Sequence, residues 1–102
     1  MSRPIKKVAA GSRVFFRIEV RDMSDAAQPL FSPVNDPTVE LRRPNGAVVV
    51  DFATMTANAI GIWTYTHQTD INDLLGVYRI QFRIVDGADI DYTIPQDAFE
   101  LV

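Results

Sequence analysis

Hydrophobic and polar residues alternate in two long stretches of the chain, Ser12–Arg21 and Gly76–Asp86. The apolar positions of the first stretch are Val14, Phe16, Ile18 and Val20. Those of the second stretch are Tyr78, Ile80, Phe82 and Ile84. A period of two residues is typical of a β-strand that buries one face and exposes the other. The pattern therefore predicts two full-length strands, and only Phe15 interrupts the alternation.

Shorter apolar stretches predict five further strands. They are Ile5–Ala9, Thr38–Arg43, Val48–Ala53, Ala59–His67 and Tyr92–Val102. In the third of these, the alternation puts Val48, Val50 and Phe52 on one face. Pro95 lies in the last stretch, where it has no N–H to donate to a neighbouring strand.

Turn-forming residues separate these strands. Asn45-Gly46 and Asp86-Gly87 favour the left-handed backbone dihedrals of tight hairpin turns. The Pro-rich residues 22–37 have no periodic pattern and predict a long loop that crosses between two sheets. Short strands at this spacing, in a chain of 102 residues, predict a single all-β domain. We expect an immunoglobulin-like antiparallel β-sandwich of about seven strands over residues 1–102.

Two details refine this prediction. In immunoglobulin-like domains, a tyrosine near the start of the sixth strand bonds back to upstream backbone, and Tyr78 has a comparable position. An ordinary core tyrosine is the alternative. Residues 1–11 are expected to form a flexible basic arm, unless Ile5–Ala9 is an edge strand as its apolar residues suggest.

The absence of cysteine and the presence of one histidine limit the chemistry open to the chain. Without cysteine there are no disulfides, thiolate zinc sites or cysteine nucleophiles. His67 follows a predicted strand end and is expected at the surface, and no serine lies in a nucleophile-elbow pattern. We therefore expect no catalytic residue, no metal and no cofactor, and we predict that the chain is not an enzyme.

Three carboxylates leave a calcium site as an alternative. Asp86, Asp89 and Asp91 follow one another closely beside Gly87, and oxygen ligands of this kind suit Ca²⁺. The other interpretation is a solvated hairpin whose charges keep a sheet edge from aggregating.

The net charge of −3 is unevenly distributed along the chain. Residues 1–51 have a net charge of +2, because eight basic residues outnumber six acidic ones. Residues 52–102 have a net charge of −5, from two arginines and seven acidic residues.

The charge of the chain also limits its expected partners. A chain with a slight excess of acidic residues is not expected to bind nucleic acid. The pattern also predicts no signal peptide, no membrane segment and no membrane partner. The basic start and the acidic final hairpin are compatible with ordinary surface charge, and the alternative is a pair of complementary patches through which copies meet head to tail in a ring or stack.

Candidate interface residues come from the basic arm and from two predicted strands. They are Arg3, Lys6, Lys7, Arg13, Phe15, Arg17, Trp63 and Tyr65. If Ile60 and Ile62 face the core, Trp63 and Tyr65 face outward and join the second strand in an aromatic and arginine-rich surface. The opposite register buries Trp63 and Tyr65, and the sequence leaves both possibilities open.

Three stretches resemble recurring patterns in small proteins of tailed phages. In residues 35–46, Asp36-Pro37 leads into a short strand and then into a hairpin at Pro44-Asn45-Gly46. Gly61–Tyr65 and Gly76–Phe82 resemble the paired later strands of the same group. Over residues 12–102 the chain is thus similar to small immunoglobulin-like virion accessory proteins of tailed bacteriophages.

This resemblance implies a non-enzymatic structural protein of a virion, in capsid decoration, head–tail joining or a tail-associated role. Its expected partners are other virion proteins and copies of itself in a symmetric or lattice assembly. Its expected location is the virion, assembled in the host cytoplasm. The alternative function is an immunoglobulin-like binding module for a carbohydrate or a surface receptor, with Trp63 and Tyr65 as stacking platforms.

Overall fold

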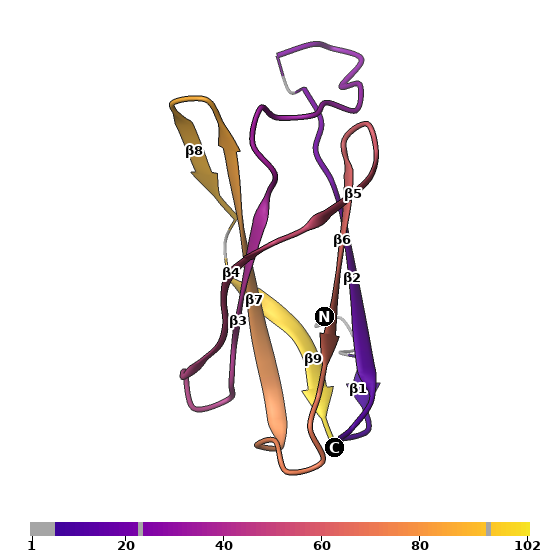
Figure 1. Cartoon of the computed structure of the whole chain (residues 1–102), viewed down its shortest axis with the longest axis vertical. Helices are drawn as coiled ribbons and strands as arrows, with labels where there is room; N and C mark the ends of the chain where they lie inside the picture. Colours follow the sequence, from indigo (N-terminus) through magenta and orange to yellow (C-terminus); the bar gives the residue numbers. More distant parts are fainter. Residues whose placement is uncertain (1–5, 23, 94) are drawn as a thin grey trace.

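The computed structural model of the chain describes residues 6–22, 24–93 and 95–102. In these residues the only regular elements are β-strands, nine in number (Figure 1). They are β1 (Lys7–Val8), β2 (Arg13–Glu19), β3 (Thr38–Arg42), β4 (Val48–Thr54), β5 (Thr56–Ala59), β6 (Ile62–Gln68), β7 (Gly76–Asp86), β8 (Asp89–Tyr92) and β9 (Gln96–Leu101). Within the described ranges, no helix has the length and apolarity needed to cross a membrane.

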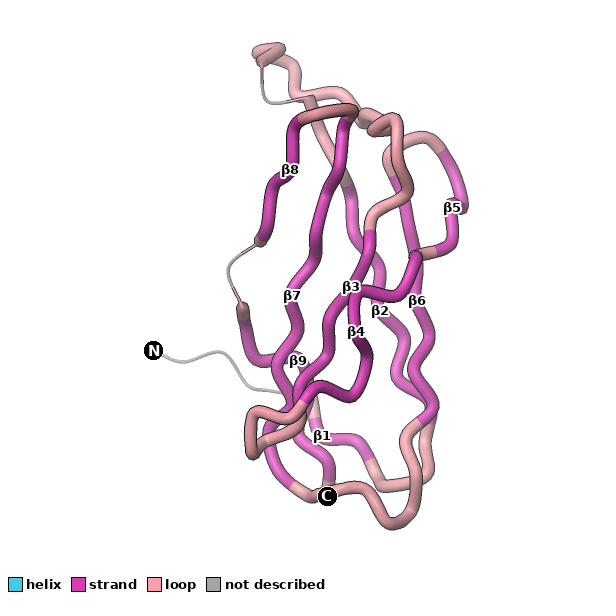
Figure 2. Tube along the Cα trace, turned by 60° about the vertical axis from the view of Figure 1, so that its left-hand side comes forward, coloured by secondary structure: helices cyan, strands magenta, loops and turns pink. Residues whose placement is uncertain are grey.

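The strands form two sheets that face each other (Figures 1 and 2). One sheet has the order β1-β9-β7-β3-β4, with β8 paired to the free part of β7, and the other has the order β2-β6-β5. Neighbouring strands are antiparallel except for β1 and β9. This is the strand order of an immunoglobulin-like sandwich. The predicted all-β sandwich is confirmed, with β5 and β8 as short strands beyond the predicted set.

The apolar faces of the two sheets meet in one core. Phe16 of β2 approaches Phe99 of β9 across the sheets, with 6.2 Å between ring centroids. Phe99 in turn stacks on Tyr78 of β7 at 4.8 Å. The fully buried Tyr78 donates a 2.8 Å hydrogen bond from its hydroxyl to the carbonyl oxygen of Leu74. The predicted bond from Tyr78 to upstream backbone is therefore confirmed, and it fastens the turn before β7 to the core.

Strand β4 departs from the predicted alternation. Its pairing with β3 shifts twice, so that β4 contains extra residues relative to its partner. Phe52 lies in one of these irregularities with a φ of +45°. An extra residue in one strand reverses the facing of the residues that follow it. The prediction that Phe52 shares a face with Val50 is therefore wrong: Val50 packs against the core, whereas the ring of Phe52 lies beside Arg83 and Tyr92.

The start of the described chain belongs to the sandwich. Lys7 and Val8 pair with β9, and Val8 is buried. Gly11 donates its N–H to Thr69 Oγ1 at 3.0 Å. Lys7 and Val8 therefore belong to an edge strand, the alternative to the predicted flexible arm, and residues 9–11 are a turn that is hydrogen-bonded to the sandwich. The remainder of that predicted arm, with Ile5, lies outside the described residues.

The predicted final strand Tyr92–Val102 is divided between two strands that pair with different parts of β7: Tyr92 is the last residue of β8, and Gln96–Leu101 form β9. β8 pairs with the second half of β7, and β9 pairs with its first half. Pro95 lies between the two pieces, where the lack of an N–H interrupts the ladder. Before β3, the long segment of residues 24–37 crosses from one sheet to the other, as its composition predicts.

Candidate interaction surfaces

The outer face of the three-stranded sheet contains three of the eight predicted interface residues. Arg13, Phe15 and Arg17 of β2 all point away from the core and are exposed. Phe15, the residue that breaks the alternation, has 60% of its surface accessible. Arg13 donates from Nε to Gln68 on the neighbouring β6 at 3.2 Å, and Arg17 pairs with Glu19 at 3.1 Å. The structure therefore brings these three predicted residues together on one face.

Trp63 and Tyr65 lie on the opposite face of the same sheet. Trp63 pairs with Ile18 and Tyr65 with Phe16, whose side chains form the apolar face of β2. Directly paired residues share a face, so both aromatic rings point into the sandwich. Trp63 is only 3% exposed, whereas Ile60 is 71% exposed. The register that exposes Trp63 is therefore wrong, and an interface that needs its indole at the surface has no basis in this fold.

The predicted basic residues at the start of the chain are only partly placed. Lys6 and Lys7 are exposed, and Lys7 pairs with Glu100 along β9. Arg3 lies outside the described residues. Of the predicted basic residues at the start of the chain, the structure therefore places the two lysines, next to and within β1.

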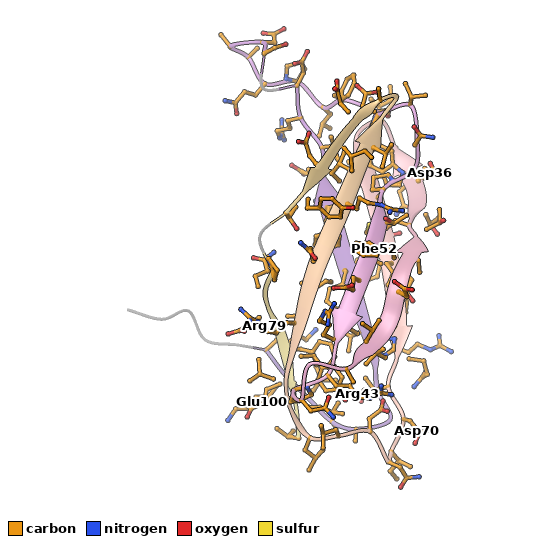
Figure 3. The ribbon with its side chains drawn as sticks, turned by 90° about the vertical axis from the view of Figure 1, so that its left-hand side faces the viewer. Asp36, Arg43, Phe52, Asp70, Arg79 and Glu100 are labelled. Carbon is orange, nitrogen blue, oxygen red and sulfur yellow. The ribbon has the colours of Figure 1, made fainter. Side chains whose placement is uncertain are left out.

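A cluster that sequence reasoning missed lies on the outer face of the six-stranded sheet. The guanidinium carbon of Arg83 lies 4.9 Å from the ring centroid of Phe52. The ring of Tyr92 meets Phe52 edge-on at 6.0 Å, and Tyr92 is 55% exposed. Figure 3 labels Phe52 among the strands of this sheet. Only the irregular pairing of β4 puts Phe52 here, so alternation along the sequence contains no signal for the cluster.

The upper end of the sandwich in Figure 1 consists of residues 21–22, 24–37, 59–61 and 86–90. Hydrogen bonds join its segments: Gly61 donates to Ser32 Oγ at 3.0 Å, and Val34 donates to Asp86 Oδ1 at 3.0 Å. Asn35 also donates to the carbonyl oxygen of Val85 at 3.2 Å. The exposed large apolar side chains of this end are Phe31, Val34, Ile60 and Ile90. Three segments far apart in sequence therefore form one surface.

The lower end consists of residues 6–13, 43–47, 68–75 and 100–102. It is also joined internally, because Thr69 donates to the carbonyl oxygen of Ser12 through both its N–H, at 3.1 Å, and its hydroxyl, at 2.6 Å. The exposed large apolar side chains here are Ile71, Leu74, Leu75 and Val102. Figure 3 shows Asp36 at the upper end and Asp70 at the lower end of the same molecule. Both ends thus expose apolar side chains.

The two ends differ in charge. The described upper end has the aspartates Asp22, Asp25, Asp36, Asp86 and Asp89. Its one basic residue, Arg21, is paired with Glu19 at 2.9 Å. The described lower end has the basic residues Lys6, Lys7, Arg13 and Arg43 and the acidic residues Asp70, Asp73 and Glu100. The upper end is therefore strongly acidic and the lower end slightly basic, a polarity that follows only in part from the two halves of the sequence.

The described surface includes two hollows. A groove of about 500 Å³ lies between the sheets. It is lined by Ile18, Glu19, Val20, Arg21, Phe82, Ile84, Thr93 and Gln96. A smaller hollow of about 270 Å³ lies beside Arg42 and Arg79 on the outer face of the six-stranded sheet. Arg42 there holds the carboxylate of Glu40 at 2.8 Å, so the hollow is lined by an ion pair that is already formed.

The calcium hypothesis for the final hairpin gains no support. The described part of the chain contains no group of three or more histidine, aspartate or glutamate side chains that are close enough to hold a metal. Asp86 instead accepts the N–H of Val34 and thereby anchors the long loop to the hairpin. Asp89 and Asp91 lie on the exposed β8, where their charges suit an edge strand that must stay unpaired.

His67 is not the surface residue that its position near a strand end predicts. It pairs with the buried Val14, so its imidazole lies on the core side of β6 and is half-buried. Its Nε2 atom is buried and has no hydrogen-bond partner among the described residues. Burial lowers the pKa of His67, and the positive charge of Arg43 adds to this effect while Asp73 opposes it.

We expect the stability of the domain to fall between pH 7.5 and 5 because of His67. The unfolded imidazole titrates near pH 6.5, and the folded one titrates lower, so the unfolded state binds more protons in between. The stabilisation is fully present above about pH 6.5 and is lost as the pH falls through the lowered pKa of the folded state. Urea denaturation across this range measures the slope. His67→Gln should remove it, and an unchanged slope in that variant would assign it to another group.

The carboxylates affect stability in a different pH range from His67. Hydrogen bonds from Arg21 and Arg17 lower the pKa of Glu19 from 4.5, and a hydrogen bond from Ser24 lowers that of Asp22 from 3.8. Their contributions are present above those unfolded values and are lost only at lower pH. The slope between pH 7.5 and 5 therefore reports on the imidazole.

Comparisons with protein families, with curated proteins and with solved structures found no match to the chain.

Proposed function

We propose that the chain is a non-enzymatic structural subunit of a tailed-phage virion and acts through contacts with other virion proteins and with copies of itself. Capsid decoration, head–tail joining and a tail-associated role all fit this proposal. In each of them, a rigid sandwich presents its ends and faces to neighbouring subunits, and repeated weak contacts on a symmetric lattice add up to firm attachment.

The resemblance of residues 35–46, 61–65 and 76–82 to small tailed-phage proteins supports the virion part of the proposal. The residues of these stretches have positions that matter for the surfaces described above. Asn35 and Asp36 belong to the upper end, and Gly61 holds the neighbouring turn against the long loop. The resemblance thus includes parts of the chain that shape an exposed end.

The observation that carries the contact role is the distribution of exposed hydrophobic side chains. Eleven large hydrophobic residues are exposed in the described chain. Eight of them lie at the two ends, and they are Phe31, Val34, Ile60, Ile71, Leu74, Leu75, Ile90 and Val102. Scattered exposed hydrophobic residues are common in soluble proteins, but clusters of them mark surfaces that contact other molecules. Both ends of the sandwich are therefore suited to protein–protein contacts.

The alternative of a carbohydrate-binding module depends on an exposed Trp63 and is not proposed. The indole of Trp63 is buried between the sheets and cannot stack on a sugar ring. Tyr65 is half-buried against the same core.

Copy number in purified particles tests the virion role. Particles produced from the genome that encodes the chain should contain it in a fixed number set by their symmetry, as measured by quantitative mass spectrometry. Copies in multiples of 60 indicate the capsid, and rings of six or twelve indicate the neck or tail. The proposal is wrong if washed particles lack the chain while their other structural proteins are present.

A further inference from the structure

We propose that copies of the chain associate end to end, with the acidic upper end of one copy seated on the basic lower end of the next. This inference rests on the proposed function, in which the chain works partly through contacts with itself. It identifies the partner of each end as the opposite end of a second copy.

Apolar complementarity is the first argument. At the upper end, Val34 and Ile60 are the most exposed large hydrophobic residues, at 80% and 71%. At the lower end, Ile71 and Leu75 are exposed to 77% and 59%. All four are on turns or loops whose backbone is fixed by hydrogen bonds to neighbouring segments, so little order is lost when they are covered. Contact between the two ends removes both apolar clusters from water at once.

The charge of the two ends determines which ends associate. Two upper ends repel each other, because each has five described aspartates against one arginine that is already paired. Lower ends have basic residues that match these aspartates, among them Arg13 and Arg43, which lie on different segments of that end. The lower end also has three acidic residues, so its positive balance is slight. Opposite potentials still attract and orient unlike ends, whereas like charges suppress pairing between two upper ends. The favoured contact therefore joins unlike ends.

The size of the ends is sufficient for a specific contact. The molecule measures 43 × 31 × 23 Å, and the ends lie at the two extremes of the longest dimension. A rectangle of 31 × 23 Å covers about 700 Å², close to the roughly 800 Å² that each partner buries in a stable interface. Because the contact joins unlike surfaces, it leaves one free end on each outer copy. It therefore continues into a ring or a stack and does not stop at a dimer.

Two double variants test the contact, one for each end. Val34→Gln with Ile60→Gln removes the apolar side chains of the upper end, and Ile71→Gln with Leu75→Gln removes those of the lower end. All four positions are exposed, so both variants should fold. Circular dichroism spectra of the two variants test whether they do. Val48→Gln is the control, because Val48 is an exposed hydrophobic residue of β4 that belongs to neither end.

Sedimentation velocity from about 10 μM to 1 mM covers the range of weak interfaces. The wild-type chain and the Val48→Gln variant should form species larger than a dimer as concentration rises, and less so in high salt because screening weakens the charge contacts. Each double variant alone should remain monomeric. Mixed in equal amounts, the two should form complexes of two chains and none larger, because each variant retains the end that the other lacks.

Three results would overturn the inference. The first is a wild-type chain that is monomeric throughout this range, and the second is loss of association in the Val48→Gln control. The third is dimerisation of either double variant alone, which shows contact between like ends. A monomeric chain that is nevertheless present in particles refutes this inference alone. A chain that associates as described but is absent from particles refutes the virion role alone.

Discussion

Replacing Trp63 with alanine should lower the free energy of unfolding by about 3–5 kcal/mol, the usual cost of removing a large aromatic side chain from a core. Trp63 is 3% exposed and pairs with Ile18 on the core face of the three-stranded sheet. A domain of this size is stable by roughly 5–15 kcal/mol, so the substitution removes a large share of its stability. Urea denaturation followed by circular dichroism measures the change.

A matched control uses the aromatic residue on the other side of the same sheet. Phe15→Ala removes a ring that is 60% exposed, and it should change stability by no more than about 0.5 kcal/mol. If the alanine variant of Trp63 fails to fold, Trp63→Phe keeps the test open. It should cost less than about 3 kcal/mol, because it retains most of the ring and removes a buried N–H that has no partner among the described residues. Similar effects of the alanine substitutions at positions 15 and 63 would contradict the register described here.

Replacing Gly61 with alanine should cost about 2–5 kcal/mol, the combined effect of backbone strain and overpacking. Gly61 has a φ of +73°, a conformation that residues with a Cβ rarely adopt. A Cβ atom here would lie 2.8 Å from the backbone nitrogen of Phe31 and 2.8 Å from the carbonyl oxygen of Val20. Because both neighbours are backbone atoms in hydrogen-bonded positions, they cannot move aside without opening the upper end.

A substitution at Gly46 measures the cost of backbone strain without the cost of overpacking. Gly46 has a φ of +88°, but a Cβ atom built on it meets nothing within 4 Å. Gly46→Ala should therefore cost only the backbone term of about 1–2 kcal/mol. Thermal denaturation of both variants measures the difference between them. Equal losses of stability in the two variants would mean that the long loop does not contact the turn at Gly61 closely enough to exclude a Cβ atom.

Several elements could be predicted because their signals are local. The alternation in β2 and β7 depends only on residues two apart, and both strands are present. The bond from Tyr78 to Leu74 joins residues four apart, so the sequence around the start of β7 contained it. The loop before β3 was recognisable from its prolines. The exposed face formed by Arg13, Phe15 and Arg17 followed from the same alternation.

The wrong predictions depend on contacts between distant residues. Large apolar groups occur on both faces of β6, so alternation alone did not decide whether Trp63 was buried; its pairing with β2 decided it. The irregular pairing of β4 with β3 turned Phe52 to the surface and created its contact with Arg83 and Tyr92. His67 lies on the core side because it pairs with Val14, a residue more than fifty positions away.

The sequence by itself determined that the chain is an all-β sandwich, since the period-two alternation of its strands depends only on residues that are close along the chain. The tertiary structure alone decided which aromatic rings are buried, because a shift of one residue in pairing reverses the facing of a whole strand. It also decided the surfaces at the two ends, where segments such as 31–35, 59–61 and 86–90 meet only after the chain has folded. The charge difference between the ends was decided in the same way, because Asp22, Asp25 and Asp36 from the first half of the chain and Asp86 and Asp89 from the second half lie at the same end.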